Sequence, residues 1–224
     1  MIRVYHHNDA DGLASAYLIA KECIKKNKEY ELIEMDYSKP FPIEKITSED
    51  TVYILDYSIE PAEMIKLLRI TDNIIWIDHH KSAIERYKDW SKSIAYPDIE
   101  LVEGIRQIGI SGCALTYLYL EGYDYTSMKE EDRLNRMYYD FDLAPLYLQL
   151  INDWDVWNHN IPETKPFMTA LNIKLDISMI ADLDEDAYEM TPLGRCMIGD
   201  LERTTLAMQL IHDGDKYIEK VIRK

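Results

Sequence analysis

Cysteine, glycine and proline are scarce in this sequence, and each scarcity excludes a class of protein. The 224 residues include only three cysteines, which are far apart and form no C-x-x-C pair. This spacing indicates neither a disulfide framework nor a zinc knuckle. We expect Cys23, Cys113 and Cys196 to be buried, reduced thiols. Eight glycines and eight prolines are too few for a long low-complexity or disordered tract, so the sequence predicts an ordered globular protein.

Long apolar runs and basic residues are also scarce. No apolar run approaches the ~20 residues needed to cross a bilayer, and the N-terminus has no signal-peptide pattern. We therefore expect a soluble, cytoplasmic protein that makes no membrane contact. The 25 basic residues are outnumbered by 41 acidic ones, which gives a formal net charge of −16. A field of this sign repels long polyanions, so we do not expect broad binding of duplex DNA.

Short apolar runs alternate with helical spacing in the N-terminal part of the chain. We expect strands at residues 2–6, 31–35, 51–55 and 74–77, and helices at 12–27, at 61–70 and from about 82. This alternation predicts an α/β fold, in which a parallel sheet is flanked by helices. The C-terminal part is mostly helical in pattern, with helices expected at 111–120, 129–140, 144–157 and about 194–211. We expect Trp154 and Trp157 to be core residues.

Four of the six histidines lie in two short polar clusters at the ends of predicted strands. The first cluster is His6-His7-Asn8-Asp9-Ala10-Asp11-Gly12, and the second is Asp78-His79-His80. Another acidic residue, Asp56, directly follows the strand expected at 51–55. Ligands of parallel sheets bind beyond the carboxyl ends of the strands, so we expect these residues to gather at one edge of the sheet.

The residue types in these clusters suit a divalent metal centre. Imidazole and carboxylate groups bind first-row ions such as Mn²⁺, Zn²⁺ or Fe²⁺, and two clusters can hold a pair of ions. Taken alone, the first cluster could be a polar turn with an N-cap carboxylate, and the paired histidines could be ordinary surface residues. Their joint placement favours a metal centre. Two ions roughly 3.5–4 Å apart can activate a water for phosphoryl displacement, which indicates a hydrolase.

The two clusters resemble the motifs of a known enzyme superfamily. His7-Asn8-Asp9-Ala10-Asp11-Gly12 together with Asp78-His79-His80 is similar to the DHH phosphoesterases, which include single-strand exonucleases, nano-RNases, cyclic-dinucleotide phosphodiesterases and family II pyrophosphatases. The four motifs of the superfamily span about residues 5–157 here. The patterns His-Asn-Asp-x-Asp-Gly and Asp-x-Asp-x-Trp most resemble the nano-RNase and cyclic-nucleotide phosphodiesterase branch.

The resemblance implies a role for each motif residue. One ion would be held by His7, Asp9 and Asp56, and the other by Asp11, Asp56, His79 and Asp153, so that Asp56 bridges the pair. The implied catalytic residues are His80, which would face the substrate phosphate, and Asp78, which would support the histidines. The implied cofactors are two Mn²⁺ ions, with Mg²⁺ or Co²⁺ as alternatives, and no organic cofactor is implied.

Two of these assignments have alternatives. Many members of the superfamily place the first histidine four residues before the first aspartate, where this chain has Tyr5, so the ligand is His6 or His7. We favour His7. In the fourth motif Asp153 and Asp155 both precede a tryptophan, and we favour Asp153.

The sequence departs from the superfamily after the fourth motif. Most members append a substrate-binding domain with a glycine-rich segment, and this chain has no such segment after Asp153. We expect residues 1–190 to form the DHH catalytic domain and residues 191–224 to form a helical extension instead of a complete second domain. A homodimer surface, a partner subunit or the helices around 111–145 would then replace the usual cap.

The leading functional hypothesis is a Mn²⁺-dependent phosphodiesterase with exonuclease-like activity. Its expected substrates are short or single-stranded oligonucleotides, such as those of an oligoribonuclease, or cyclic nucleotides. Long duplex DNA is not expected as a partner, because of the acidic charge balance. The alternatives are a phosphatase or pyrophosphatase of a small phosphate compound, and a non-catalytic scaffold that keeps the DHH fold.

Overall fold

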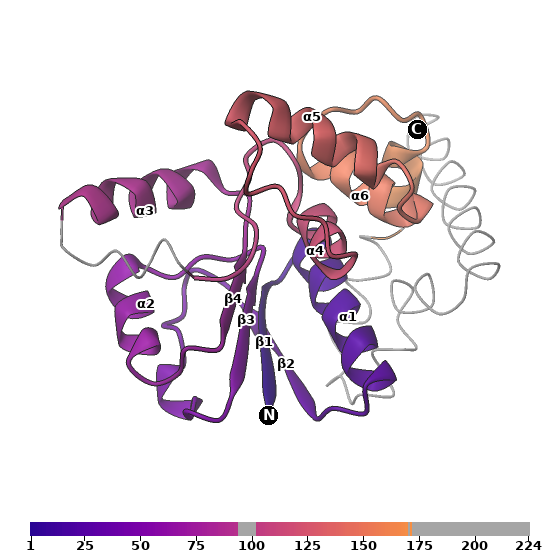
Figure 1. Cartoon of the computed structure of the whole chain (residues 1–224). Helices are drawn as coiled ribbons and strands as arrows, with labels where there is room; N and C mark the ends of the chain where they lie inside the picture. Colours follow the sequence, from indigo (N-terminus) through magenta and orange to yellow (C-terminus); the bar gives the residue numbers. More distant parts are fainter. Residues whose placement is uncertain (94–101, 170, 172–224) are drawn as a thin grey trace. The chain divides into compact units, whose positions relative to one another are not determined.

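The computed structural model describes residues 1–93, 102–169 and 171 (Figure 1). Cys196, the helix expected at about 194–211 and the extension expected at 191–224 lie outside these residues. The chain divides into two compact units, Met1–Asp142 and Leu143–Lys224, which are described separately below.

A sheet of four parallel strands forms the centre of the first unit. The strands are β1 (Ile2–His7), β2 (Tyr30–Met35), β3 (Thr51–Leu55) and β4 (Ile74–Ile77), in the order β2-β1-β3-β4. Their register aligns His6 with Leu55, and Leu55 with Ile77. Because β1, β3 and β4 end at nearly the same level, the residues that follow them meet at one edge of the sheet. The sequence predicted β3 and β4 to the residue, and β1 and β2 to within one residue.

Helices cover both faces of this sheet (Figure 1). The helix α1 (Ala10–Lys25) lies on one face together with α4 (Gly112–Leu120), and the helices α2 (Pro61–Leu68) and α3 (Lys81–Ser93) lie on the other. A further helix, α5 (Glu130–Phe141), packs against α4. The predicted α/β fold is thus confirmed, and the described residues after β4 form helices joined by loops.

Apolar side chains fill the layer between the sheet and the helices α2 and α3. Tyr5, Ile54 and Trp76 come from neighbouring strands, and Met64 and Leu67 of α2 pack against them. All of these side chains are buried, and each large apolar side chain contributes roughly 1.5–3 kcal/mol on burial. Strand residues alternate between the two faces, so every second residue of β1, β3 and β4 faces α1 and α4 instead. The core fixes the strands whose ends carry the polar clusters.

The described part of the second unit contains the helix α6 (Leu146–Asp155), the loop that follows it and further helical residues at 164–169 and 171. After the helix, Trp157 adopts a positive φ of 56°. The expectation that Trp157 is a core residue was wrong, because its side chain is 80% exposed. Trp154 is partly buried, and its ring lies edge-on to the His159 ring with the two centroids 5.3 Å apart.

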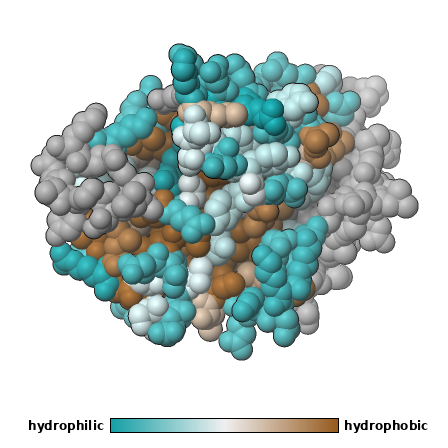
Figure 2. Space-filling model, viewed as in Figure 1, coloured by the Kyte–Doolittle hydropathy of each residue, from teal (hydrophilic) through white to brown (hydrophobic). Residues whose placement is uncertain are grey.

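The described surface is mixed in character. Figure 2 shows hydrophilic residues bordering the hydrophobic ones on the face that it presents. Within the described residues, every helix is too short or too polar to span a membrane.

Candidate metal centre

The carboxyl edge of the sheet brings the predicted acidic and histidine side chains together. His7 ends β1, Asp56 follows β3, and His79 lies just beyond β4. The Asp56 Oδ1 atom is 3.1 Å from His79 Nε2, and the Asp56 Oδ2 atom is 3.9 Å from His7 Nδ1. The Nε2 atom of His79 also lies 3.7 Å from an Asp11 carboxylate oxygen. Residues from three strand ends therefore share one site.

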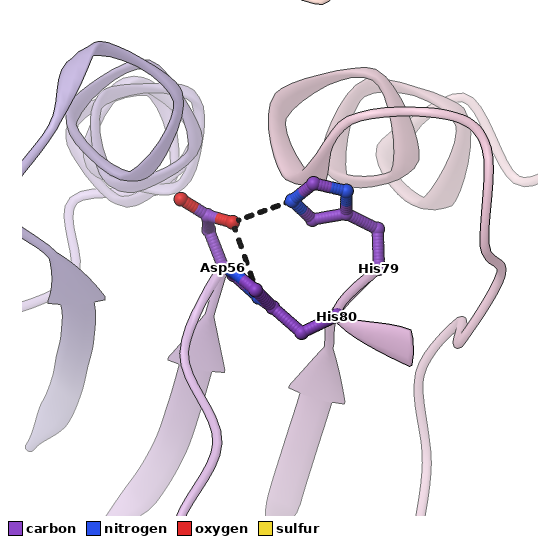
Figure 3. A group of neighbouring side chains, drawn as sticks. All are labelled: Asp56, His79 and His80. Atoms are coloured by element: carbon purple, nitrogen blue, oxygen red, sulfur yellow. Dashed lines mark ion pairs between the residues drawn. The ribbon is translucent and has the colours of Figure 1, made fainter. Parts of the chain in front are cut away.

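Asp56 occupies the centre of this arrangement. Its side chain is 1% exposed, and one carboxylate oxygen faces His79 and His80 (Figure 3). The other oxygen faces His7. Its φ of 50° lies in the left-handed region, which costs energy for a residue other than glycine and is typical of functional sites. The unusual backbone turns the side chain away from the end of β3 and between the two clusters. Both carboxylate oxygens of Asp56 therefore face imidazole nitrogens, and its role as the bridge between two ions stays a prediction.

Two groups of donor atoms share Asp56. One group consists of His7, Asp9 and Asp56, and the other consists of Asp56, His79 and His80; within each group the donor atoms lie within 4.8 Å of one another. Imidazole nitrogens combined with carboxylate oxygens fit first-row divalent ions better than the all-oxygen sets preferred by Mg²⁺ or Ca²⁺. The carboxylates together with His7 and His79 therefore fit such ions, whereas the Nδ1 atom of His80 is already 2.7 Å from the Asp78 carboxylate.

The carboxylate of Asp9 combines a structural role with a place in the first group. Its Oδ1 atom accepts a hydrogen bond of 2.9 Å from the Gly12 amide and caps α1, while Oδ2 lies 2.7 Å from His7 Nδ1. Burial by itself would raise the pKa of Asp9, but the His7 imidazole and the Gly12 amide bring it down to about 2. The polar-turn and metal-centre interpretations of this cluster are therefore compatible, because the two oxygens face different partners.

The structure distinguishes the two histidines at the end of β1. His6 lies on the same strand face as Val4, its side chain is 3% exposed, and its Nδ1 atom is 2.8 Å from the His7 carbonyl oxygen. Burial lowers the pKa of His6 to about 4, which favours the neutral ring. His7 instead lies beside Asp9 and Asp56. His7, and not His6, therefore lies among the grouped donor atoms, and its assignment as the metal ligand stays a prediction.

The N-terminus of α4 is packed against two buried aspartates of the site, Asp11 and Asp56. Both Asp11 oxygens accept backbone hydrogen bonds, from the Gly112 amide at 2.6 Å and from the Cys113 amide at 2.7 Å. The positive end of the helix dipole stabilises a carboxylate in this position. A Cβ atom at residue 112 would lie 2.7 Å from the Cβ of Asp56, so the approach requires glycine.

Another buried aspartate, Asp78, orients His80. The Asp78 carboxylate lies 2.7 Å from His80 Nδ1, and it accepts hydrogen bonds from the His79 amide at 2.9 Å and from the Ser58 hydroxyl. Burial by itself would raise the pKa of Asp78, but the His80 imidazole and the Ser58 hydroxyl lower it below its usual value. A carboxylate on one ring nitrogen fixes the ring and leaves Nε2 as the other functional atom.

A family model named DHH family, N-terminal domain, matches residues 1–145 of the chain. The chain belongs to the DHH family. Members of this family are phosphoesterases that depend on divalent metal ions, in agreement with the donor groups at the carboxyl edge. The match coincides closely with the first compact unit.

A curated relative extends the comparison. This DHH chain is 28% identical over 128 residues to an uncharacterised protein of Methanocaldococcus jannaschii. The aligned region covers 55% of the chain and 29% of the relative, so the chain spans less than a third of that protein's length.

The aspartates of the predicted fourth motif lie on α6, in the second unit of this DHH chain. The Asp153 carboxylate accepts hydrogen bonds from the Asn160 amide at 2.8 Å, the Ile161 amide at 3.2 Å and the Thr164 hydroxyl at 2.5 Å. It therefore holds the loop that follows the helix. Asp155 is partly buried near the end of the same helix. The assignment of Asp153, and its alternative Asp155, stay predictions.

Sequence reasoning did not identify Gly112 or Ser58 as residues of the site. The Ser111-Gly112 pair was interpreted only as the start of a helix, and Ser58 carried no motif. A small residue at the N-terminus of a buried helix was the one available signal for Gly112. Nothing in the local sequence indicated the hydrogen bond from Ser58 to Asp78, which are 20 residues apart.

Proposed function

We propose that this chain is a phosphodiesterase that uses two divalent ions, preferentially Mn²⁺, to hydrolyse short or single-stranded oligonucleotides or cyclic nucleotides. The observation that carries the proposal is the Asp56 carboxylate, whose two oxygens face the two donor groups. A metal pair in such a site supplies an activated water and neutralises charge on the phosphoryl group. Mn²⁺ is proposed because imidazoles accompany the carboxylates in both groups.

The protein residues around the ions would position the reaction. Asp56 would keep the two ions at a fixed separation, and its buried, strained backbone limits its movement. His80 would act on the substrate: when both ring nitrogens carry protons, Nδ1–H donates to Asp78 and Nε2–H can donate to a phosphate or leaving-group oxygen. Asp78 is thus a positioning residue, which keeps the His80 ring in one orientation.

The charge of the chain supports a small substrate. A net charge of −16 repels an extended polyanion, whereas ions bound at the carboxyl edge would attract a single phosphodiester locally. This combination favours an oligonucleotide end or a cyclic nucleotide over a long duplex.

A substrate panel with Mn²⁺ tests the proposal directly. The purified chain is assayed on a dinucleotide, a short single-stranded RNA, a cyclic mononucleotide and pyrophosphate, and bound metal is measured by elemental analysis. We expect phosphodiester hydrolysis with about two ions per chain. The Asp56→Asn variant should lose activity, and Asp50→Asn, which changes a buried aspartate outside the site, should retain it.

Three results would contradict the proposal. Equal Mn²⁺-dependent rates for the wild-type chain and the Asp56→Asn variant would show that the bridging carboxylate is not used. Hydrolysis of pyrophosphate alone would replace the phosphodiesterase by a phosphatase. The absence of bound metal under metal-replete conditions would favour a scaffold with the DHH fold.

A further inference from the structure

A cavity of about 470 Å³ adjoins the candidate metal centre within the first unit. Its wall includes His80, which also belongs to the donor group around Asp56 (Figure 3). Its wall also includes Tyr37, Tyr57, Lys39, Glu60 and Arg86. The volume lies in the range of roughly 300–1,000 Å³ that is typical of small-molecule sites. We call this space the Tyr37 cavity.

Tyr37 provides an exposed aromatic surface in the wall. Its side chain is 58% exposed, and its ring stacks on the ring of Tyr57 with a centroid distance of 4.7 Å and an interplanar angle of 23°. Tyr57 is buried, and its carbonyl oxygen accepts a hydrogen bond from the Trp76 indole. The Tyr37 ring is therefore supported by a fixed partner, which lowers the entropy cost of binding another ring.

The position of Tyr37 links this surface to the reacting centre. Its ring centroid lies 5.7 Å from that of His7, a member of the other donor group. The cavity is thus bordered by a histidine of one group and lies close to a histidine of the other. A substrate whose phosphate lies between the two groups would place its neighbouring nucleoside here.

The charges of the cavity favour a nucleoside over a second phosphate. The Lys39 ammonium lies 3.2 Å from the Asp36 carboxylate, and the Arg86 guanidinium forms an ion pair with Glu60. Both cations of the wall therefore have carboxylate partners within the protein. Carboxylates such as Glu60 can accept hydrogen bonds from exocyclic amino groups or ribose hydroxyls, but they repel phosphate.

We propose that the Tyr37 cavity binds the nucleoside adjacent to the scissile phosphate, with its base stacked on Tyr37. This inference rests on the proposed function and narrows it to nucleotide substrates that carry a base on this side of the phosphate. Stacking on an aromatic side chain tolerates every base, so the cavity selects a nucleoside without selecting its sequence.

Matched substrates and variants test this inference. The wild-type chain and the variants Tyr37→Ala and Tyr37→Phe are assayed with Mn²⁺ on a dinucleotide and on the same dinucleotide lacking one base. We expect Tyr37→Ala to lower kcat/KM on the complete dinucleotide by roughly 5- to 100-fold, mainly through KM. Its rate on the abasic compound should match the wild type, and Tyr37→Phe should retain both rates. Tyr139→Ala removes an exposed tyrosine of α5 and is the control.

A binding measurement keeps the inference testable if the chain has no activity. A free nucleoside without phosphate is titrated into each protein and followed by calorimetry, with the expectation that Tyr37→Ala binds at least about fivefold more weakly than the wild type. A wild-type chain that hydrolyses no phosphodiester of the substrate panel overturns the proposed function, while nucleoside binding still decides the cavity. Equal losses on both dinucleotides, or unchanged nucleoside binding in Tyr37→Ala, overturn the inference alone.

Discussion

The two edges of the sheet in the first unit both hold buried aspartates, but with different partners. At the amino edge, Asp50 lies 3.2 Å from the N-terminal amine and 3.0 Å from the Arg3 guanidinium, and it accepts hydrogen bonds from the Thr47 amide and hydroxyl. At the carboxyl edge, Asp11 accepts hydrogen bonds from two backbone amides, and Asp56 is flanked by three imidazoles. At the amino edge, cationic groups of the chain itself pair with the aspartate. The carboxyl edge instead has the carboxylate and imidazole groups that bind metal ions.

This difference separates stability from function within one sheet. A carboxylate paired with cations and hydrogen-bond donors contributes to the free energy of unfolding at neutral pH. The carboxylates at the carboxyl edge lie close together and repel one another, so they contribute to stability mainly when they bind ions. We therefore expect variants at the amino edge to lose stability and variants at the carboxyl edge to lose activity and metal response.

The largest expected effect comes from Asp56→Asn. Metal-based charge stabilisation is worth several kcal/mol, so we expect a loss of kcat/KM on the order of 10³-fold. Without metal, the melting temperature of the variant should equal or exceed that of the wild type, because one charge is removed and asparagine tolerates a positive φ.

Calorimetry with and without Mn²⁺ measures the stability of the wild type and of Asp56→Asn. Mn²⁺ at about 100 times its Kd should stabilise the wild type by roughly 2.7 kcal/mol, and the variant by much less. If Asp56→Asn were as unstable as Asp50→Asn without metal, the two edges would not differ as described.

The next largest effect is expected from Gly112→Ala. The added methyl group would lie 2.7 Å from the Asp56 Cβ and 3.1 Å from an Asp11 oxygen, so the start of α4 must move. We expect a loss of roughly 1–3 kcal/mol in stability and of about 10- to 100-fold in activity or Mn²⁺ affinity.

Gly122→Ala is the matched control for this glycine. Gly122 has a positive φ of 78°, and a Cβ atom there would have no heavy atom within 4 Å. Its replacement should cost about 1–2 kcal/mol through backbone strain alone and leave activity intact. Full activity in Gly112→Ala, despite reduced stability, would show that the contact of α4 with the aspartates is structural only.

The sequence predicted the strands and the polar clusters because both depend on local patterns. Apolar, β-branched runs determine β3 and β4, and the acidic residues after them are visible as interruptions of these runs. The first helix begins at Ala10 and not at Gly12, because Asp9 caps it. Gly112 could not be recognised, since it contacts Asp11 across 101 residues of sequence. The Tyr37 cavity likewise depends on packing between separate loops.

The third prediction concerns Asp50 and pH. Burial by itself would raise the pKa of Asp50, but the Thr47 amide and the Arg3 guanidinium bring it below the usual value. A lowered pKa in the folded state adds stability above the unfolded value of ~3.9, and this contribution is lost as the pH falls through the folded pKa.

Asp50→Asn should therefore lower the free energy of unfolding at pH 7 by about 2 kcal/mol. When the pH falls below about 4, the variant should lose less of its free energy of unfolding than the wild type does. Urea unfolding between these pH values measures both quantities. Glu22→Gln removes a surface ion pair with Lys25 and should cost less than ~1 kcal/mol. A pH dependence identical to that of the wild type would show that Asp50 does not supply this stability.

The smallest effect is expected from Ser58→Ala, which removes one donor from Asp78. Asp78 keeps the amide of His79 and the ring of His80, so its position should change little. We expect kcat to fall about 2- to 10-fold, because the Asp78 carboxylate then holds the His80 ring less firmly. Ser58→Thr keeps the hydroxyl and should restore kcat. An unchanged kcat in Ser58→Ala would mean that the His79 amide and the His80 ring hold Asp78 without the hydroxyl. The carboxyl edge would then resemble the amino edge in having more donors than one aspartate needs.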